Sequence, residues 1–301
     1  MSILTEIFAH KRTEVAEAKV RVPESELEKQ ALATPVPPDF IRALTSELSS
    51  TYQRLRSDLS YTSRLIAEVK HRSPSKGVLC PDFDPLRLAR TYAENGAAAI
   101  SVLTDEKYFG GRLDYLREIA EMFGAYEDRR GMNPPATEQR RINPALPRVP
   151  LLRKDFIFDR YQLLEARAAG ASAALLIAAM LEQDTLCQLI AEAHSLSLTP
   201  LVEIHTRAEL ARALGAGADV VGINNRDLHT FKVSLQTSLD LRSHIPDGVV
   251  VVAESGIKTL EDVRVLAEAE VDAMLIGEGL VTAGDVGARV REFSGGREVI
   301  V

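Results

Sequence analysis

Residues 66–77 place charged side chains within an apolar run. Glu68 and Lys70 stand two positions apart in a stretch that otherwise has the pattern of a buried strand. Side chains alternate between the two faces of a strand, so both charges point the same way. A buried strand tolerates such a pair only where that face reaches a polar cavity. The following Ser-Pro-Ser-Lys-Gly loop suits an anionic ligand, so the pattern predicts a site at the C-terminal end of this strand.

Polar side chains also stand at the ends of five other apolar runs. They are Lys154, Glu203, Asn224 with Arg226, Glu254 with Ser255, and Glu278. Each of these residues could also have a purely structural role. Arg153, Lys154 and Asp155, for example, could form a surface ion-pair cluster. Asn224 and Asn225 could be turn formers that bond to the local backbone. Six strand ends that carry acids, ammonium groups and an amide nevertheless favour an active site.

Alternating strand and helix patterns provide the elements that position these residues. Strand patterns occur at 64–70, 98–103, 150–153, 172–178, 199–203, 219–223, 248–253 and 272–276. Helical patterns occur at 84–95, 112–122, 159–169, 182–196, 206–215, 234–243, 258–269 and 285–293. Eight strands, each followed by a helix, within about 240 residues predict a (β/α)8 TIM barrel, where functional residues gather at the C-terminal strand ends. The alternative, a doubly wound sheet, rarely reaches eight strictly alternating units.

Two segments lie outside this alternation. Residues 1–60 predict an N-terminal helical extension, with amphipathic helices at 3–19 and 40–48 joined by a proline-rich connector. Residues 126–149 are polar and rich in proline and arginine, which is typical of a surface insertion at the N-terminal face, although its arginines could serve a partner contact. We expect residues 1–301 to form a single barrel domain.

Two glycine-containing loops indicate a phosphate site. Ser255 and Gly256 precede one helical pattern, and Gly277 and Gly279 precede the last. Glycine lets backbone amides approach an anion, and a helix N-terminus adds partial positive charge. The glycines could instead only permit tight turns. Barrels often bind phosphate at the loops after strands seven and eight, which favours the phosphate.

Composition limits the partners and the chemistry. The formal net charge of −7 argues against non-specific binding to nucleic acid or to an anionic membrane. The longest nearly unbroken apolar run, 171–181, is too short to span a bilayer, and the N-terminus lacks a signal-peptide pattern. The sequence contains two cysteines, no His pair four apart on a helix and no complete dinucleotide fingerprint. We therefore expect a cytoplasmic monomer or weak homo-oligomer that uses Lys and Glu chemistry without a metal or cofactor.

Six segments resemble the indole-3-glycerol phosphate synthases of tryptophan biosynthesis. They read IAEVKHRSPSKG (66–77), SVLTDEKYFGG (101–111), LRKDFI (152–157), LVEI (201–204), GINNRDL (222–228) and AESGI (253–257). Their order and spacing cover most of the chain. The resemblance implies a phosphorylated substrate, 1-(2-carboxyphenylamino)-1-deoxyribulose 5-phosphate. It also implies a carboxy-lyase that closes the ring and releases carbon dioxide and water to give indole-3-glycerol phosphate.

The resemblance also implies roles for individual residues. Lys154 would protonate the ribulose carbonyl, Glu203 would accept a proton or assist the dehydration, and Asn224 would orient a substrate hydroxyl. Glu68 and Lys70 would contact the substrate. The remaining expected binding residues are Glu254, which would support the charge network, and Ser73, Arg226, Ser255, Gly256 and Gly277, which would bind phosphate or substrate.

Further expectations concern the walls of the site. Leu103, Phe109, Phe156 and Ile177 could line a slot for the aromatic ring or be ordinary core. Loop 73–77 is expected to be a mobile lid. Glu278 stands where some members of the family have a serine near the phosphate, so we expect its carboxylate to turn away.

Two rival functions predict different residues. Another phosphate-binding barrel, such as phosphoribosylanthranilate isomerase or the tryptophan synthase α subunit, should lack Glu68 and Lys70 in combination with Lys154 and Glu203. A catalytically dead barrel acting as a scaffold should have lost one or more of these positions, and all are present. Because the chain ends near Val301, with no room for the second barrel of fused forms, a monofunctional lyase is expected.

Overall fold

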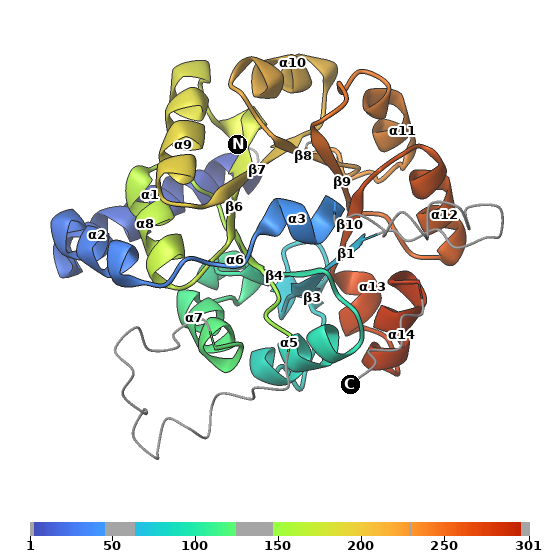
Figure 1. The fold of residues 1–301 in the computed structure, drawn as a ribbon, viewed down its shortest axis with the longest axis horizontal. Coiled ribbons are helices and arrows are strands. Elements are labelled where there is room, and N and C mark those ends of the chain that lie inside the picture. Colours follow the sequence, from blue (N-terminus) through green and yellow to red (C-terminus); the bar gives the residue numbers. More distant parts are fainter. Residues whose placement is uncertain (1–2, 46–63, 125–146, 229, 296–301) are drawn as a thin grey trace.

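Eight parallel strands close into a barrel in the computed structural model, which describes residues 3–45, 64–124, 147–228 and 230–295 (Figure 1). The strands are β1 (Arg64–Val69), β4 (Ala99–Leu103), β5 (Leu151–Lys154), β6 (Ala173–Ile177), β7 (Thr199–Ile204), β8 (Val220–Asn224), β9 (Val250–Glu254) and β10 (Ala273–Ile276). The order around the barrel is β1-β10-β9-β8-β7-β6-β5-β4, and β1 also pairs with β4. The predicted TIM barrel is therefore confirmed, and an open doubly wound sheet is excluded because Ile66 of β1 lies opposite Leu275 of β10.

A helix near each predicted range follows every barrel strand. These helices are α5 (Pro85–Glu94), α7 (Leu113–Met122), α8 (Arg160–Ala168), α9 (Gln183–Ser195), α10 (Arg207–Gly215), α11 (Gln236–Arg242), α12 (Leu260–Glu268) and α14 (Val286–Phe293). Five of them begin at a side chain that accepts a hydrogen bond from the first turn: Asp84, Asp159, Thr206, Thr259 and Asp285. Such caps satisfy backbone donors at the helix start and so define where each βα loop ends.

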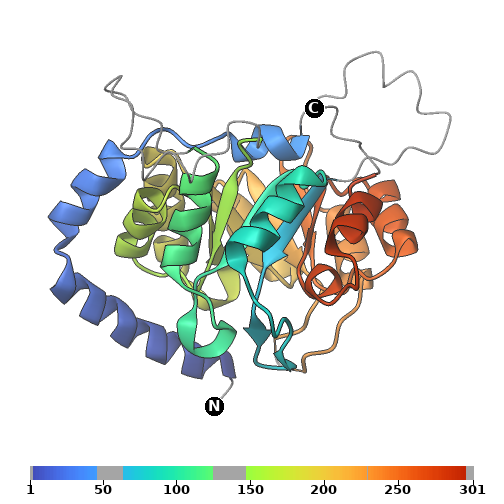
Figure 2. The same ribbon diagram turned by 90° about the horizontal axis from the view of Figure 1, so that it is seen from below.

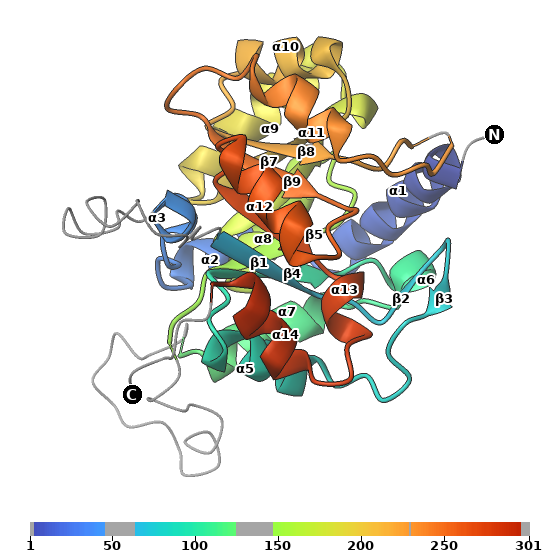
Figure 3. The ribbon, with the colours of Figure 1, turned by 90° about the vertical axis from the view of Figure 1, so that its right-hand side faces the viewer.

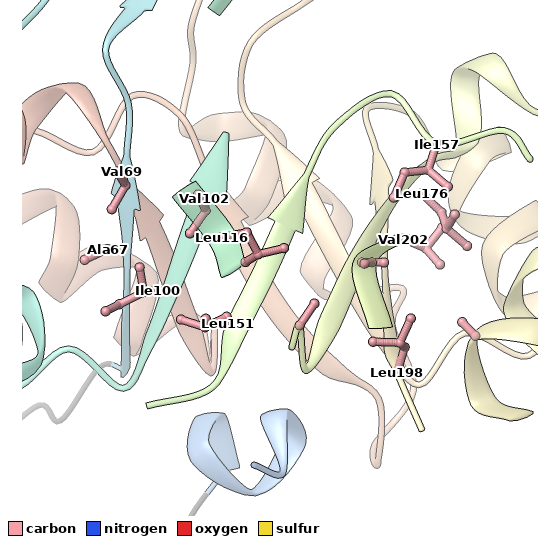
Figure 4. Packing of buried hydrophobic residues seen from close by; sticks show 14 of the residues in the cluster. Ala67, Val69, Ile100, Val102, Leu116, Leu151, Ile157, Leu176, Leu198 and Val202 are labelled. Atoms are coloured by element: carbon pink, nitrogen blue, oxygen red, sulfur yellow. The ribbon is translucent and has the colours of Figure 1, made fainter. Parts of the chain in front are cut away.

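Alternation along the strands separates two apolar layers. Ile66 and Leu152 belong to the cluster inside the barrel, whereas their neighbours Ala67 and Leu151 belong to the layer between barrel and helices. Figure 4 shows part of this outer layer, including Ala67, Val102, Leu151 and Val202. Residues two positions beyond an inner residue face inward as well. The last inward position of several strands therefore carries the polar residues of the site.

The N-terminal extension contains three helices, α1 (Ile3–Arg21), α2 (Glu24–Ala33) and α3 (Phe40–Thr45). Figures 2 and 3 show α1 at the end of the barrel where the strands finish and α3 at the opposite end. Phe40 and Leu44 of α3 join the inner cluster and close that end. The sequence pattern missed α2, which begins after Pro23 and packs on α8 through a short apolar stripe. A stripe of two buried residues, Leu27 and Ala31, is too brief for a clear helical period.

The βα loops contain short elements that the sequence did not predict. They are the hairpin of β2 (Arg72–Ser73) and β3 (Gly77–Val78), α6 (Glu106–Phe109), the 3-10 turn η1 (Ala178–Met180) and α13 (Glu278–Val281). Elements of two to four residues show no measurable periodicity. Residues 126–146 of the expected insertion at 126–149 lie outside the described residues.

A buried ion-pair network joins α1 to the barrel. Lys11 is 5% exposed, and its Nζ lies 2.9 Å from Asp105 and 3.1 Å from Asp155. Asp155 also pairs with Arg153 at 3.1 Å and accepts a hydrogen bond from Thr104. The alternative of a surface cluster around Lys154 is therefore wrong for Arg153 and Asp155, which are both buried. The network holds α1 directly beside the end of β5.

Replacing Lys11 by methionine is expected to lower the free energy of unfolding by about 3 kcal/mol, because two buried carboxylates lose a partner. Burial opposes ionisation of Asp155, but Lys11 and Arg153 lower its pKa to about 2. A carboxyl with a lowered pKa stabilises the fold above its ordinary pKa, and this stabilisation is lost as the pH falls through about 2. The loss of unfolding free energy in the variant should therefore be greatest at pH 7 and become smaller in strong acid. Urea unfolding at several pH values measures this.

Lys19 provides the matched control. Its ion pair with Asp159 also joins α1 to the barrel, but both side chains are partly exposed. Lys19→Met should lower stability by less than about 1 kcal/mol. Equal losses in the two variants would show that the buried network does not anchor α1.

Candidate active site

One cavity of about 930 Å³ lies at the C-terminal ends of the barrel strands. Its walls contain all eleven site residues predicted from the sequence: Glu68, Lys70, Ser73, Lys154, Glu203, Asn224, Arg226, Glu254, Ser255, Gly256 and Gly277. Its apolar wall includes Leu103, Phe109, Phe156 and Ile177. The size suits a ligand with an aromatic ring and a phosphorylated chain. Residues far apart in the sequence thus meet because six strands end at the same rim.

Lys154 is at the centre of the charged part of the cavity. Its Nζ forms an ion pair with Glu254 and lies 3.5 Å from Oε2 of Glu203. Glu68 and Lys70 pair with each other, which confirms that they share a face of β1. Glu68, Glu203 and Glu254 are all buried. Three buried carboxylates thus surround the ammonium groups of Lys154 and Lys70, whose side chains are 15% and 17% exposed.

Two glycines make room for these carboxylates. A Cβ on Gly222 of β8 would overlap Oε1 of Glu254, which extends across it from the neighbouring strand. A Cβ on Gly277 would overlap the carboxylate of Glu68 in the same way. Glycine is needed here for close approach rather than for backbone conformation. The space that these two glycines leave open therefore determines where Glu68 and Glu254 can lie.

The electrostatic surroundings set the protonation of Lys154 and its partners. Burial alone would lower the pKa of Lys154, but Glu254, Glu203 and Glu68 raise it above its ordinary value. Burial, together with the negative charges of Glu203 and Glu68, raises the pKa of Glu254 to about 7 although Lys154 opposes this. Burial would raise the pKa of Glu68, but Lys70 and Lys154 lower it. Lys154 is therefore protonated in the free protein, as a general acid must be.

The loop after β9 has an unusual backbone conformation. Ser255 and Gly256 both have positive φ, 63° and 83°. Positive φ is uncommon for serine and requires support from the surroundings. Asn225 provides part of it, since its Nδ2 donates to the Ser255 carbonyl and its Oδ1 accepts from the Ser238 amide. The turn-forming alternative is thus confirmed for Asn224, whose Oδ1 accepts from the backbone amide of Arg226, although Asn224 also lines the cavity. The side-chain bonds of Asn225 reach distant segments instead, so Asn225 is not a local turn former.

Several lining residues were not predicted as site residues. They are Ile3, Leu4 and Ile7 of α1, Lys76, Leu228, Phe231, Val233, Lys258 and Arg289. Lys76 pairs with Glu278 at 2.5 Å and so joins the β2–β3 hairpin to α13 across the rim. Arg289 donates to the carbonyl of Lys258. Lys258 could have been found from its place in a βα loop, but nothing in the sequence indicates that α14 reaches the cavity.

The described residues, 3–45, 64–124, 147–228 and 230–295, contain neither a cluster of metal-ligand side chains nor a helix able to span a membrane. Within those ranges, no three His, Cys, Asp or Glu side chains are grouped as a metal site would require. Of the helices in the described segments, none is both long and apolar enough to cross a bilayer.

Sequence comparisons identify close relatives of this chain. A family model described as "Indole-3-glycerol phosphate synthase" matches residues 4–293. The indole-3-glycerol phosphate synthase of Roseiflexus sp. strain RS-1 is 46% identical over 297 residues, which cover 98% of this chain and 99% of that protein. The protein of the same name from Chloroherpeton thalassium is 43% identical over 283 residues, covering 94% of this chain and 96% of the relative.

Solved structures share the fold at low sequence identity. A crystal structure of 3-hexulose-6-phosphate synthase aligns with a TM-score of 0.57 at 14% identity, covering 77% of this chain and 98% of that one. Thiamine phosphate pyrophosphorylase from Pyrococcus furiosus aligns with a TM-score of 0.52 at 17% identity, covering 78% of this chain and 96% of that one. At such identities these matches support the barrel alone.

Proposed function

This chain belongs to the indole-3-glycerol phosphate synthase family, and from that premise we propose which residues perform the reaction. The protein is a decarboxylating lyase of tryptophan biosynthesis, and it converts 1-(2-carboxyphenylamino)-1-deoxyribulose 5-phosphate to indole-3-glycerol phosphate. The observation that supports the assignment of residues is the single cavity whose walls hold all eleven of them, with Lys154 among three carboxylates. The test is the appearance of indole fluorescence when purified protein meets this substrate. Substrate binding without product would contradict the assignment.

Lys154 is the general acid of ring closure in this proposal. The ring carbon that bears the carboxylate attacks the ketone carbon, and Lys154 donates a proton to the ketone oxygen. Carbon dioxide then leaves, and the electron pair of the broken bond restores the aromatic ring. The raised pKa of Lys154 keeps the proton available until the oxygen becomes basic during attack.

Glu203 is the base of the later dehydration. The carbon beside the nitrogen must lose a proton while the new hydroxyl leaves as water. Glu203 is buried, lines the cavity and lies 3.5 Å from Lys154, so it can act on the same bound intermediate. Asn224 orients a hydroxyl of the substrate chain, and Glu254 holds Lys154 through their ion pair.

Glu68 and Lys70 act as a pair beside the carboxylate of the substrate. Their ion pair leaves Lys70 beside the cavity, where its ammonium can contact the substrate carboxylate. The aromatic ring fits the apolar wall, where the ring centroids of Phe109 and Phe156 lie 6.0 Å apart. Holding the flexible chain bent between a polar anchor and an apolar slot brings the two reacting carbons together.

The phosphate is bound, in this proposal, by Ser73, Arg226, Ser255, Gly256 and Gly277, which line the same cavity. Backbone amides of the glycine loops and the Arg226 guanidinium supply donors for an anion. Glu278 follows Gly277 directly, and its carboxylate pairs with Lys76. This pairing neutralises a negative charge that would otherwise oppose the phosphate, and it also occupies the Lys76 ammonium.

The Glu278→Ser variant is expected to lower the KM for the substrate about fivefold, because it removes a carboxylate beside the phosphate loop and frees the Lys76 ammonium, a gain of about 1 kcal/mol. Steady-state kinetics with the fluorescent product measures this. Glu261→Ser on the exposed face of α12 is the control and should leave KM unchanged. An unchanged or higher KM in Glu278→Ser would mean that the ion pair with Lys76 aids binding.

The setting of the reaction is also a proposal. We expect the protein to work in the cytoplasm as a monomer or weak homo-oligomer, on a small phosphorylated substrate, without nucleic acid or membrane partners and without a cofactor. Bacterial biosynthetic relatives and the acidic composition support this view.

A further inference from the structure

His205 lies beside Glu203 and is not among the residues that line the cavity. It follows β7, and its side chain is only 9% exposed. The imidazole Nε2 is 3.4 Å from Oε1 of Glu203, while the other oxygen of Glu203 faces Lys154. The contact is an ion pair rather than a well-aligned hydrogen bond. Such contacts in free enzymes often tighten when substrate binds.

Glu209 holds the other side of the ring. Its Oε2 lies 3.2 Å from Nδ1 of His205 and accepts the backbone N–H of the same residue at 2.6 Å. The position of Glu209 is fixed by the first turn of α10, where its amide donates to the capping hydroxyl of Thr206. The Glu209 side chain is 17% exposed and does not line the cavity, so water can reach its carboxylate. The four side chains form a continuous line from Glu209 through His205 and Glu203 to Lys154.

The reaction proposed above takes up one proton in each turnover. The ketone oxygen leaves as water after accepting two protons, and the carbon beside the nitrogen loses one. Loss of carbon dioxide releases none, because the substrate carboxylate is already ionised. Glu203 can return the carbon proton to the departing hydroxyl, whereas Lys154 ends the cycle without the proton that it donated. A proton from solvent must therefore return to Lys154, whose side chain is 15% exposed and faces the cavity that the substrate fills.

We propose that this proton travels from water at Glu209 through His205 and Glu203 to Lys154, and so restores the general acid between turnovers. The inference rests on the proposed roles of Lys154 and Glu203. Imidazole suits the task because it takes up a proton on one nitrogen and releases one from the other. His205 and Glu209 are positioning residues, since they act on the substrate only through the two catalytic side chains.

The charges around His205 support this role. Burial would lower its pKa, but Glu209, Glu203 and Glu254 all face it and together raise the pKa above the ordinary value. The same contact lowers the pKa of Glu209, although burial opposes this. His205 is thus a cation over a wider pH range than a free histidine. Proton delivery should fail as the pH rises through the pKa of His205.

The test compares steady-state and single-turnover kinetics of His205→Gln with the same substrate. At pH 6.5, where the wild-type imidazole can carry the proton, kcat is expected to fall about tenfold, while the single-turnover rate constant stays within about twofold of wild type. The first turnover is spared because Lys154 begins it protonated. The deficit in kcat should shrink above the pKa of His205, where wild type loses the same proton carrier. Equal loss in both measurements would show a structural role and overturn the proposal, as would an unchanged kcat.

Glu209→Gln gives an independent test that does not depend on His205→Gln folding. Loss of the Glu209 charge lowers the pKa of His205, so the alkaline limb of the kcat profile should move to lower pH. A limb that does not move overturns the proposal. His194→Gln, at an exposed position on α9, is the matched control and should match wild type in every measurement. Failure of wild type to form product would instead contradict the proposed function itself.

Discussion

Replacing Lys154 by alanine is expected to lower kcat for indole formation by about a thousandfold or more, because the variant has no acid at the ketone oxygen. Lys154 lies among three buried carboxylates, and the charges of Glu254, Glu203 and Glu68 keep it protonated. Binding of indole-3-glycerol phosphate should remain within a few-fold of wild type, since the phosphate and ring contacts are elsewhere. Product fluorescence measures the first quantity, and equilibrium titration of the product measures the second.

Lys154→Arg separates the proton from the positive charge. Arginine keeps the cation that Glu254 and Glu203 need, but its guanidinium does not lose a proton in proteins. The variant should therefore fold with near-normal stability and still be as inactive as the alanine variant. Lys29→Ala, at an exposed position on α2, controls for loss of a lysine elsewhere. Substantial turnover in Lys154→Arg would mean that Lys154 acts as a charge and that another group supplies the proton.

The site was predictable to the extent that it depends on strand periodicity. Glu68, Lys154 and Glu203 each stand two residues beyond an inward apolar residue of the same strand. A sequence pattern can show that register, and parallel strands of a barrel bring such positions to one rim. The same pattern also located the barrel strands and the helices between them.

Contacts between distant parts of the chain could not be predicted in this way. Lys11 meets Asp155 across 144 positions of sequence, and Lys76 meets Glu278 across 202. Neither pair has a local signal, because the geometry depends on how α1 and the β2–β3 hairpin lie over the rim. His205 was missed for a related reason. A histidine after a strand has no distinctive pattern until the structure shows which side of Glu203 it occupies.

Glu203→Gln is the second variant with a large expected effect, a loss of about a hundredfold or more in kcat, since glutamine cannot accept the proton released in dehydration. The amide keeps the size of the side chain, so KM should change little. Steady-state kinetics at saturating substrate gives both constants. Glu26→Gln, at an exposed position on α2, is the control and should be fully active.

The same variant also tests the electrostatics of the cavity without turnover. The negative charge of Glu203 contributes to raising the pKa of Glu254, which is about 7 in the wild type. Removing that charge should let Glu254 ionise at lower pH, a shift that carboxyl-selective NMR titration can detect. The charge of Glu203 also raises the pKa of Lys154, so that amine should lose its proton at lower pH as well. If both pKa values fall while kcat is unchanged, Glu203 serves only to keep Lys154 charged. If kcat falls as expected, the carboxylate is needed as a base, because Glu254 and Glu68 still surround Lys154 in the variant and favour its charged form.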